Sequence, residues 1–391
     1  MRSGTTRPAR FAWWRALPPL ALIVALVFWF LATDPLSGLE GNAPPIEELT
    51  IERATLDEVG IKLRVRADGS EPVSIAQVLV DGAYWSFRQD PEGPLARLRT
   101  ARIEIPYPWV EGETHHITLL TRNGLAFEHT IEVATTSPTP GPRRLLAFAL
   151  LGLYVGFVPV SLGLLFYPYL RTIGRRGMYF LLALTVGLLA FLFVDTLEEA
   201  TELAIGAAGA FQANGLVWLG ALLSFVTLMA VGRRHGRPTG VALAFFLALG
   251  IGLHNLGEGL AIGAAYAAGE AALGSFLVVG FTLHNLSEGI GIASPLTRQS
   301  VRLPTFIGLA ALAGLPTVLG TWTGAFAFAP HWAALFLGIG AGAILQVMVE
   351  VGSHLAATAR SEGDSWVSGT TLAGFAVGLA VMYATAFLVT V

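Results

Sequence analysis

The sequence predicts an all-α membrane protein: an eight-helix transmembrane bundle, preceded by one N-terminal transmembrane helix and a small β-sandwich domain. Of the 391 residues, 54% are hydrophobic and only 13% are charged, which is too apolar for an ordinary soluble protein. Long apolar segments recur along the chain, and many have the ~20 residues that a helix needs to cross a bilayer. The net charge of −3 gives no reason to expect a nucleic-acid partner, and the absence of cysteine excludes disulfides and thiolate metal sites.

The first 33 residues have the features of a signal anchor. Residues 1–16 carry four arginines and are expected to stay in the cytoplasm, and the apolar run within 17–33 is long enough to cross a membrane. A cleaved signal peptide is the alternative. The run ends in the bulky sequence Phe28-Trp29-Phe30-Leu31 and lacks a clear small-residue cleavage site, which favours a retained anchor.

Residues 34–136 differ in composition and predict a separate extracytoplasmic domain. They hold most of the acidic residues of the chain, and Asp-Gly and Asn-Gly pairs within them predict tight turns. Four stretches alternate between apolar and polar residues at the period of half-buried strands, at 61–66, 74–80, 116–121 and 127–133. We expect an immunoglobulin-like β-sandwich, followed by a Pro-rich linker at 137–144.

Eight apolar segments follow within residues 145–391, and each can span ~30 Å of hydrocarbon at about 1.5 Å per residue. We expect membrane helices at 145–169, 179–198, 215–232, 241–266, 271–296, 304–328, 331–357 and 368–390.

Arginine occurs in every second connection of this region, and the connections between them contain no Lys or Arg. The Arg-bearing connections are Arg171 to Arg176, Arg233 to Arg237, Arg298 to Arg302, and Arg360. By the positive-inside rule they face the cytoplasm. We therefore expect an integral protein of the cell (inner) membrane, with a cytoplasmic N-terminus and with the β domain and the C-terminus outside.

The most informative feature is a peptide repeated in two consecutive membrane segments. The sequence His-Asn-Leu-Gly-Glu-Gly at 254–259 recurs as His-Asn-Leu-Ser-Glu-Gly at 284–289. Residues i and i+4 share a helix face, so each copy presents one imidazole and one carboxylate in the same direction. A carboxylate near the bilayer centre costs roughly 2.5–3.5 kcal/mol, and a divalent cation would compensate it. The expected ligands are His254, Glu258, His284 and Glu288. Hydrogen bonds between helices are the alternative role.

These paired motifs, within eight spans whose two ends lie outside, resemble the ZIP family of divalent metal transporters. The resemblance covers about residues 145–391. It implies a bundle that moves zinc, iron or manganese toward the cytoplasm as two helix groups shift relative to each other. It also implies that the His and Glu residues of both copies form the primary metal site, and that Asn255 and Asn285 belong to a second one.

The sequence departs from the family pattern at several positions. Gly257 and Ser287 stand where the motifs have Pro, and Asn285 stands where the fifth-helix motif commonly has Glu or Asp. On the sixth helix, Thr317 occupies the place of a family Glu ligand. Because the second site thereby loses negative charge, we expect one tightly bound ion.

Further polar residues are expected along a transport path. Four acidic side chains near the outer end of the second core helix would raise the local cation concentration, with a solvated helix end as the alternative. They are Asp195, Glu198, Glu199 and Glu202. Glu350 and His354, near the inner end of the seventh helix, form another i, i+4 pair and are expected to be an exit station, with a helix-packing hydrogen bond as the alternative. The histidines of the β domain, His115, His116 and His129, are expected to be ordinary strand residues, with metal binding for delivery as the alternative.

The sequence therefore predicts a transporter of divalent metal ions, with Zn²⁺ expected and Fe²⁺ or Mn²⁺ as alternatives. We expect no enzymatic activity and no cofactor besides the transported ion. The expected partners are the metal and the lipid bilayer; a homodimer is compatible with the sequence, which identifies no partner for the β domain. An intramembrane metal-dependent hydrolase and a metal-sensing receptor are the alternatives. Neither motif reads His-Glu-x-x-His, which argues against the hydrolase. All predicted cytoplasmic connections are short and leave no room for an output domain, which argues against the receptor.

Overall fold

The computed structural model describes residues 17–33, 47–234, 236–269 and 271–390. These fall into two units that are considered separately, one ending at Ile46 and the other beginning at Glu47.

The described part of the first unit is a single apolar helix, α1 (Leu17–Thr33). Its side chains from Ala21 to Phe30 are all exposed. A helix that is apolar on every side is suited to a lipid environment. The predicted cytoplasmic residues 1–16 and the beginning of the predicted β domain, 34–46, lie outside the described residues.

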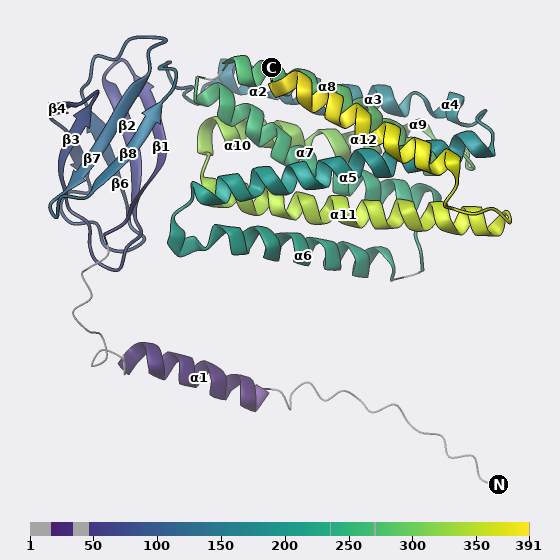
Figure 1. Ribbon diagram of the computed structural model, residues 1–391, viewed down its shortest axis with the longest axis horizontal. Coiled ribbons are helices and arrows are strands. Elements are labelled where there is room, and N and C mark those ends of the chain that lie inside the picture. Colours follow the sequence, from purple (N-terminus) through teal and green to yellow (C-terminus); the bar gives the residue numbers. More distant parts are fainter. Residues whose placement is uncertain (1–16, 34–46, 235, 270, 391) are drawn as a thin grey trace, which may run out of the picture. The chain divides into compact units, whose positions relative to one another are not determined.

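The second unit begins with a two-sheet β region. Its strands are β1 (Leu49–Asp57), β2 (Gly60–Ala67), β3 (Ile75–Val80), β4 (Ala83–Trp85), β5 (Arg88–Asp90), β6 (Thr100–Ile105), β7 (His115–Thr121) and β8 (Ala126–Ile131). Neighbouring strands are antiparallel and form two sheets, in the orders β1-β2-β6-β5 and β4-β3-β7-β8 (Figure 1).

Alternating apolar side chains form the core of this region. Ile61, Leu63 and Val65 on β2 are fully buried, as are Ile117 and Leu119 on β7. Successive residues of a strand point to opposite faces, so the polar residues between them lie on the other side of each sheet. The four stretches that predicted strands fall in β2, β3, β7 and β8.

Eight helices of the described chain are long and apolar enough to cross a membrane. The first span comprises α2 (Pro142–Gly152), a π-helical turn (Leu153–Phe157), α3 (Val158–Leu164) and α4 (Tyr167–Leu170). The others are α5 (Arg175–Ile205), α6 (Ala213–Gly232), α7 (Gly240–Ala267), α8 (Ala271–Ala293), α9 (Leu303–Gly314) with α10 (Pro316–Ala327), α11 (Pro330–Ser361) and α12 (Gly369–Thr390). The structure therefore shows the mostly helical architecture with eight membrane-length helices that the sequence predicts.

The element boundaries differ from the predicted ones in two places that matter for the site. α2 begins at Pro142, inside the expected linker, because proline is favoured in the first turn of a helix. α5 continues to Ile205, so the four acidic residues at 195–202 lie within a helix whose last turns extend beyond the predicted segment.

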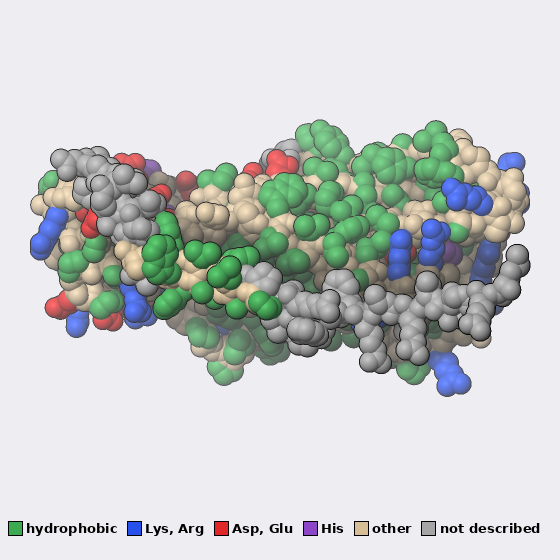
Figure 2. Space-filling model, turned by 90° about the horizontal axis from the view of Figure 1, so that it is seen from below, with side chains coloured by type: hydrophobic (Ala, Val, Ile, Leu, Met, Phe, Trp, Pro, Cys, Tyr) green, Lys and Arg blue, Asp and Glu red, His purple; other side chains and the backbone are tan. Residues whose placement is uncertain are grey.

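The β region and the Arg-bearing connections lie at opposite ends of the helices (Figure 1). Between these ends, hydrophobic side chains cover much of the helical surface that Figure 2 shows. This distribution suits a bundle surrounded by lipid, with its connections in the two aqueous phases.

Two residues of the β region hydrogen-bond directly to the helical part. Arg53 on β1 donates through Nη1 to the carbonyl O of Phe326 (2.9 Å) and through Nη2 to that of Ala325 (2.8 Å). The last carbonyls of a helix have no helical donors, and a cation there also interacts favourably with the helix dipole. At the connection between α5 and α6, Asp68 Oδ1 accepts a hydrogen bond from the backbone N–H of Ala210 (2.8 Å).

We expect the Arg53→Met variant to unfold at a lower temperature in detergent than the wild type. The substitution keeps much of the side-chain volume but leaves two carbonyls without their charged donor, a loss of about 1.5–3 kcal/mol for a hydrogen bond to a charged group. Arg64→Met is the matched control, because the Arg64 side chain is 59% exposed and the buried Glu52 that it contacts also pairs with Arg66. An equal decrease of the unfolding temperature in the two variants would show that the hydrogen bonds of Arg53 do not specifically stabilise the contact between the β region and the helices.

Candidate metal site

The two copies of the repeated motif lie in the middle of α7 and α8, and each packs beside a helix that proline interrupts. α7 packs against α10 and α8 packs against α3. Pro316 separates α9 from α10, and Pro159 follows the π-helical turn that precedes α3. Proline has no N–H, so each break leaves a main-chain carbonyl without a helical donor.

The asparagine of each motif donates to a main-chain carbonyl beside one of these breaks. Asn285 donates through Nδ2 to the carbonyl O of Val155 (3.1 Å), the residue four positions before Pro159. Asn255 donates through Nδ2 to the carbonyl O of Ala313 (3.1 Å), in the last turn of α9. Both asparagines are fully buried, and no hydrogen bond among the described residues reaches either Oδ1 atom.

The last glycine of each motif allows the broken helix to come close. A methyl group at Gly259 would lie 2.2 Å from the carbonyl O of Thr317 on α10, and one at Gly289 would lie 2.3 Å from that of Val160 on α3. Both distances are shorter than any van der Waals contact, so a side chain at either position would push the helices apart.

Three side chains of the two motifs converge on one point. His254 Nε2 lies 3.1 Å from Glu258 Oε1, and His284 Nε2 forms a hydrogen bond with the same oxygen. Asn285 Nδ2 donates to the other oxygen, Glu258 Oε2, at 3.0 Å. The candidate ligand atoms of His254, Glu258 and His284 all lie within 4.8 Å of one another, and all three residues are buried. Two imidazole nitrogens and a carboxylate oxygen are a ligand set suited to Zn²⁺, Fe²⁺ or Mn²⁺.

Glu288, the fourth expected ligand, is buried but does not belong to this three-residue group. It interacts electrostatically with Glu258 and with both histidines, and Asn255 lies close to it. No hydrogen bond of normal geometry in the described chain reaches either of its carboxylate oxygens. A buried carboxylate without a partner is unfavourable, so Glu288 requires a proton or a cation.

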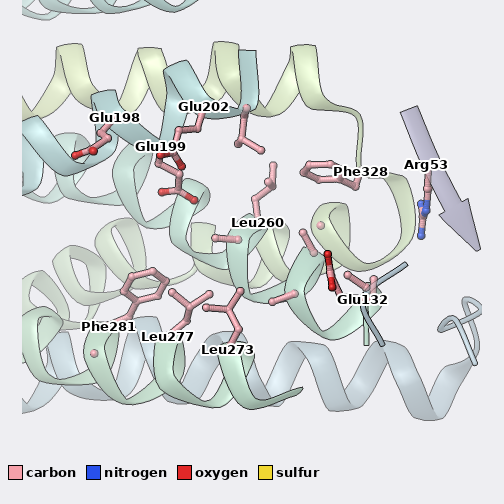
Figure 3. A pocket seen from close by; sticks show the side chains of 18 of the residues that line it. Arg53, Glu132, Glu198, Glu199, Glu202, Leu260, Leu273, Leu277, Phe281 and Phe328 are labelled. Carbon is pink, nitrogen blue, oxygen red and sulfur yellow. The ribbon is translucent and has the colours of Figure 1, made fainter. Parts of the chain in front are cut away.

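A cavity of about 690 Å³ leads to this cluster from the side of the β region and reaches His284. Asp195 of α5 lines it, and so do Glu198, Glu199 and Glu202 of the same helix and Phe281 of α8 (Figure 3). The acidic residues predicted to attract cations therefore lie on the wall of a path to the candidate ligands. Carboxylates that line a concave surface concentrate cations there.

Residues of the β region also line this cavity, among them His129 on β8 and Glu132, which directly follows that strand. Burial lowers the pKa of His129, which favours its neutral form. No spacing within the sequence places β-region residues near the site, because their position depends on how the strands meet the helices.

The remaining expected path residues lie elsewhere. Thr317 on α10 is fully buried, and its hydroxyl has no hydrogen-bond partner among the described residues. Glu350 is buried and its Oε1 accepts a hydrogen bond from Arg233 Nε at 2.7 Å. This ion pair between α11 and the end of α6 favours the helix-packing alternative for Glu350. His354 is half-buried, one turn further along α11.

Thr196 is a site residue that the sequence did not indicate. Its Oγ1 lies 3.1 Å from Nδ1 of His254, and both residues are buried. Thr196 is in α5 and His254 is in α7, so no spacing within the sequence connects them.

The chain matches no model of a known protein family, and no curated protein matches it in a sequence comparison.

We expect Glu258→Gln to weaken metal binding much more than Glu288→Gln does. Glu258 contacts both histidines, and removing one partner of a buried charged pair costs about 3–5 kcal/mol, which corresponds to roughly 100-fold or more in affinity. Glu288 lies outside the three-residue group and acts through longer-range attraction, for which we expect about tenfold, or ~1.4 kcal/mol. Equilibrium dialysis of detergent-purified protein with Zn²⁺ measures both, and equal losses would instead favour four equivalent ligands.

Proposed function

We propose that the protein is a ZIP-like transporter of divalent transition-metal ions, which carries them across the membrane toward the cytoplasm. The observation that supports this most directly is the buried cluster of His254, Glu258 and His284, at the inner end of an acid-lined cavity in a protein with eight membrane-length helices. An ion attracted by the α5 carboxylates would reach His284 first. It would then meet Glu258 and His254 at the centre of the bundle.

A purely structural hydrogen-bond network explains these residues less well. Such a network needs polar groups, but it does not need two carboxylates in the membrane interior, where each is costly. Glu288 and the two asparagine Oδ1 atoms are buried acceptors without described donors. Buried acceptors without donors are typical of a site that binds a cation.

The physiological ion is proposed as Zn²⁺, with Fe²⁺ and Mn²⁺ as alternatives. Imidazole and carboxylate ligands bind all three, and Zn²⁺ is the tightest of them in the Irving–Williams order. The protein has no thiolate that would favour softer ions.

A metal-dependent hydrolase is the second candidate. Two His and one Glu are also the protein ligands of some catalytic zinc sites, where water occupies the fourth position. Here the cavity reaches His284, and the buried Glu288 carboxylate accepts no hydrogen bond of normal geometry from the described residues. The four acidic residues that line the cavity favour passage of a cation over binding of a peptide or ester substrate.

We expect purified protein in liposomes to take up Zn²⁺. His284→Ala and Glu258→Ala should each reduce the rate of uptake at least about tenfold, because these side chains bind the ion. Expression of both variants should stay close to wild type, because the fold rests on helix packing. His116→Ala is the matched control and should transport normally, since His116 is an exposed residue of β7 that does not itself line the cavity. Wild-type protein that hydrolyses a substrate without any metal flux would support the hydrolase instead.

The orientation proposed from the arginines places the β region outside the cell and the Arg-bearing connections in the cytoplasm. The chain contains no cysteine, so single cysteines report position without background. We expect an impermeant maleimide added to intact cells to label Glu71→Cys in the β region and to spare Arg176→Cys until the membrane is permeabilised. The reverse pattern would show that the orientation, and with it the proposed direction of transport, is wrong.

A further inference from the structure

Thr196 makes an unusual contact for a threonine in a membrane helix. Threonine hydroxyls in helices commonly bond to a carbonyl one turn earlier, as Thr185 of the same helix does with Leu181 O at 3.0 Å. The Thr196 hydroxyl instead contacts Nδ1 of His254 on α7, at 3.1 Å. Only 1% of Thr196 is exposed, so water does not compete for this contact.

The other ring nitrogen of His254 faces the candidate metal position. Nε2 lies 3.1 Å from Glu258 Oε1, the oxygen that both histidines contact. A neutral imidazole carries one N–H, and a nitrogen that binds a metal must be the unprotonated one. His254 therefore presents Nε2 to an ion only when its proton is on Nδ1, and that N–H needs a hydrogen-bond acceptor.

The Thr196 hydroxyl oxygen is the described acceptor in that position. It has two lone pairs, and its own proton can rotate away from the ring. Hydrogen bonds of this kind fix the tautomer and the ring orientation of metal-binding histidines.

We propose that Thr196 is a positioning residue for metal binding: its hydroxyl oxygen accepts a hydrogen bond from Nδ1–H of His254 and so holds Nε2 toward the ion. This inference rests on the proposed metal-binding function of the His254 cluster and goes beyond it. Helix α5 carries no ligand of the three-residue group, but through Thr196 it would set the orientation of one ligand, His254.

The two histidines then have different roles. In the described chain, the hydrogen bonds of His284 involve Nε2 alone, while its ring packs against Phe281 with centroids 5.3 Å apart. His284 also lines the cavity, whereas His254 does not. His284 is thus the ligand that an arriving ion meets, and His254 is the ligand fixed in advance by Thr196.

Two substitutions separate the hydroxyl group from the volume of the side chain. Thr196→Val keeps the shape and removes the hydroxyl, whereas Thr196→Ser keeps the hydroxyl and removes the methyl group. Thr185→Val on the same helix is the control, because it removes a buried hydroxyl that bonds within its own helix. Co²⁺ and Zn²⁺ affinities are measured in detergent, and the visible absorption of bound Co²⁺ reports the coordination geometry.

We expect Thr196→Val to bind metal roughly 10–100-fold more weakly with an altered Co²⁺ spectrum, the range typical for loss of such a supporting contact. Thr196→Ser and Thr185→Val should remain close to wild type in both measurements. In ¹⁵N-histidine NMR of the metal-loaded wild type, His254 should show its proton on Nδ1.

Wild-type affinity and spectrum in Thr196→Val, or a loss in Thr196→Ser as large as in Thr196→Val, would show that Thr196 only fills space. The NMR measurement tests the inference even if Thr196→Val fails to fold, since a proton on Nε2 of His254 in the metal-loaded protein contradicts it. Failure of the wild type to bind any divalent metal would instead overturn the proposed function from which the inference starts.

Discussion

The buried carboxylate of Glu258 is the group around which the centre of the molecule is arranged. Both histidines contact its Oε1, and Asn285 donates to its Oε2. Its ion pairs among the described residues are with these two histidines and with no Lys or Arg. An ionised carboxylate in such a place is stable only when nearly all its acceptor positions are used. Helices α7 and α8 contribute to that condition, through His254 and through His284 and Asn285, and α5 contacts His254 through Thr196, which explains why polar residues are concentrated at this depth.

The repeated motif combines three different requirements in six residues. Its His and Glu supply the candidate ligands, its Asn donates to a main-chain carbonyl beside a proline break, and its last Gly lets the broken helix approach. The Asn amide is shared, because Asn285 also donates to Glu258. A helix break would be unfavourable within lipid unless a neighbouring helix satisfied its backbone. The motif therefore joins metal binding to the packing of α7 on α10 and of α8 on α3.

The parts of this structure that could be predicted are those with a local signature. Eight apolar segments and the i, i+4 spacing of His and Glu depend on neighbours in sequence, and both were recognised. The role of Asn255 and Asn285 as donors to Ala313 and Val155 was not, since these partners lie 58 and 130 residues away. The same holds for the pair of Arg233 with Glu350. Strands β4 and β5 have three residues each, too few for an alternating pattern, and β1 is only partly buried along both faces.

Helix α5 connects the approach of an ion to its binding. Asp195, Glu198 and Glu202 are exposed on its cavity side, where their charges attract cations without the cost of full burial. Thr196, next to Asp195 in sequence, is buried and faces the other way, toward His254. Neighbouring residues of a helix point in directions about 100° apart, so one helix can line the cavity and support a ligand at the same depth. Any displacement of α5 relative to α7 would change both the acidic wall of the cavity and the orientation of His254. Access to the site and the affinity of the site would then change together.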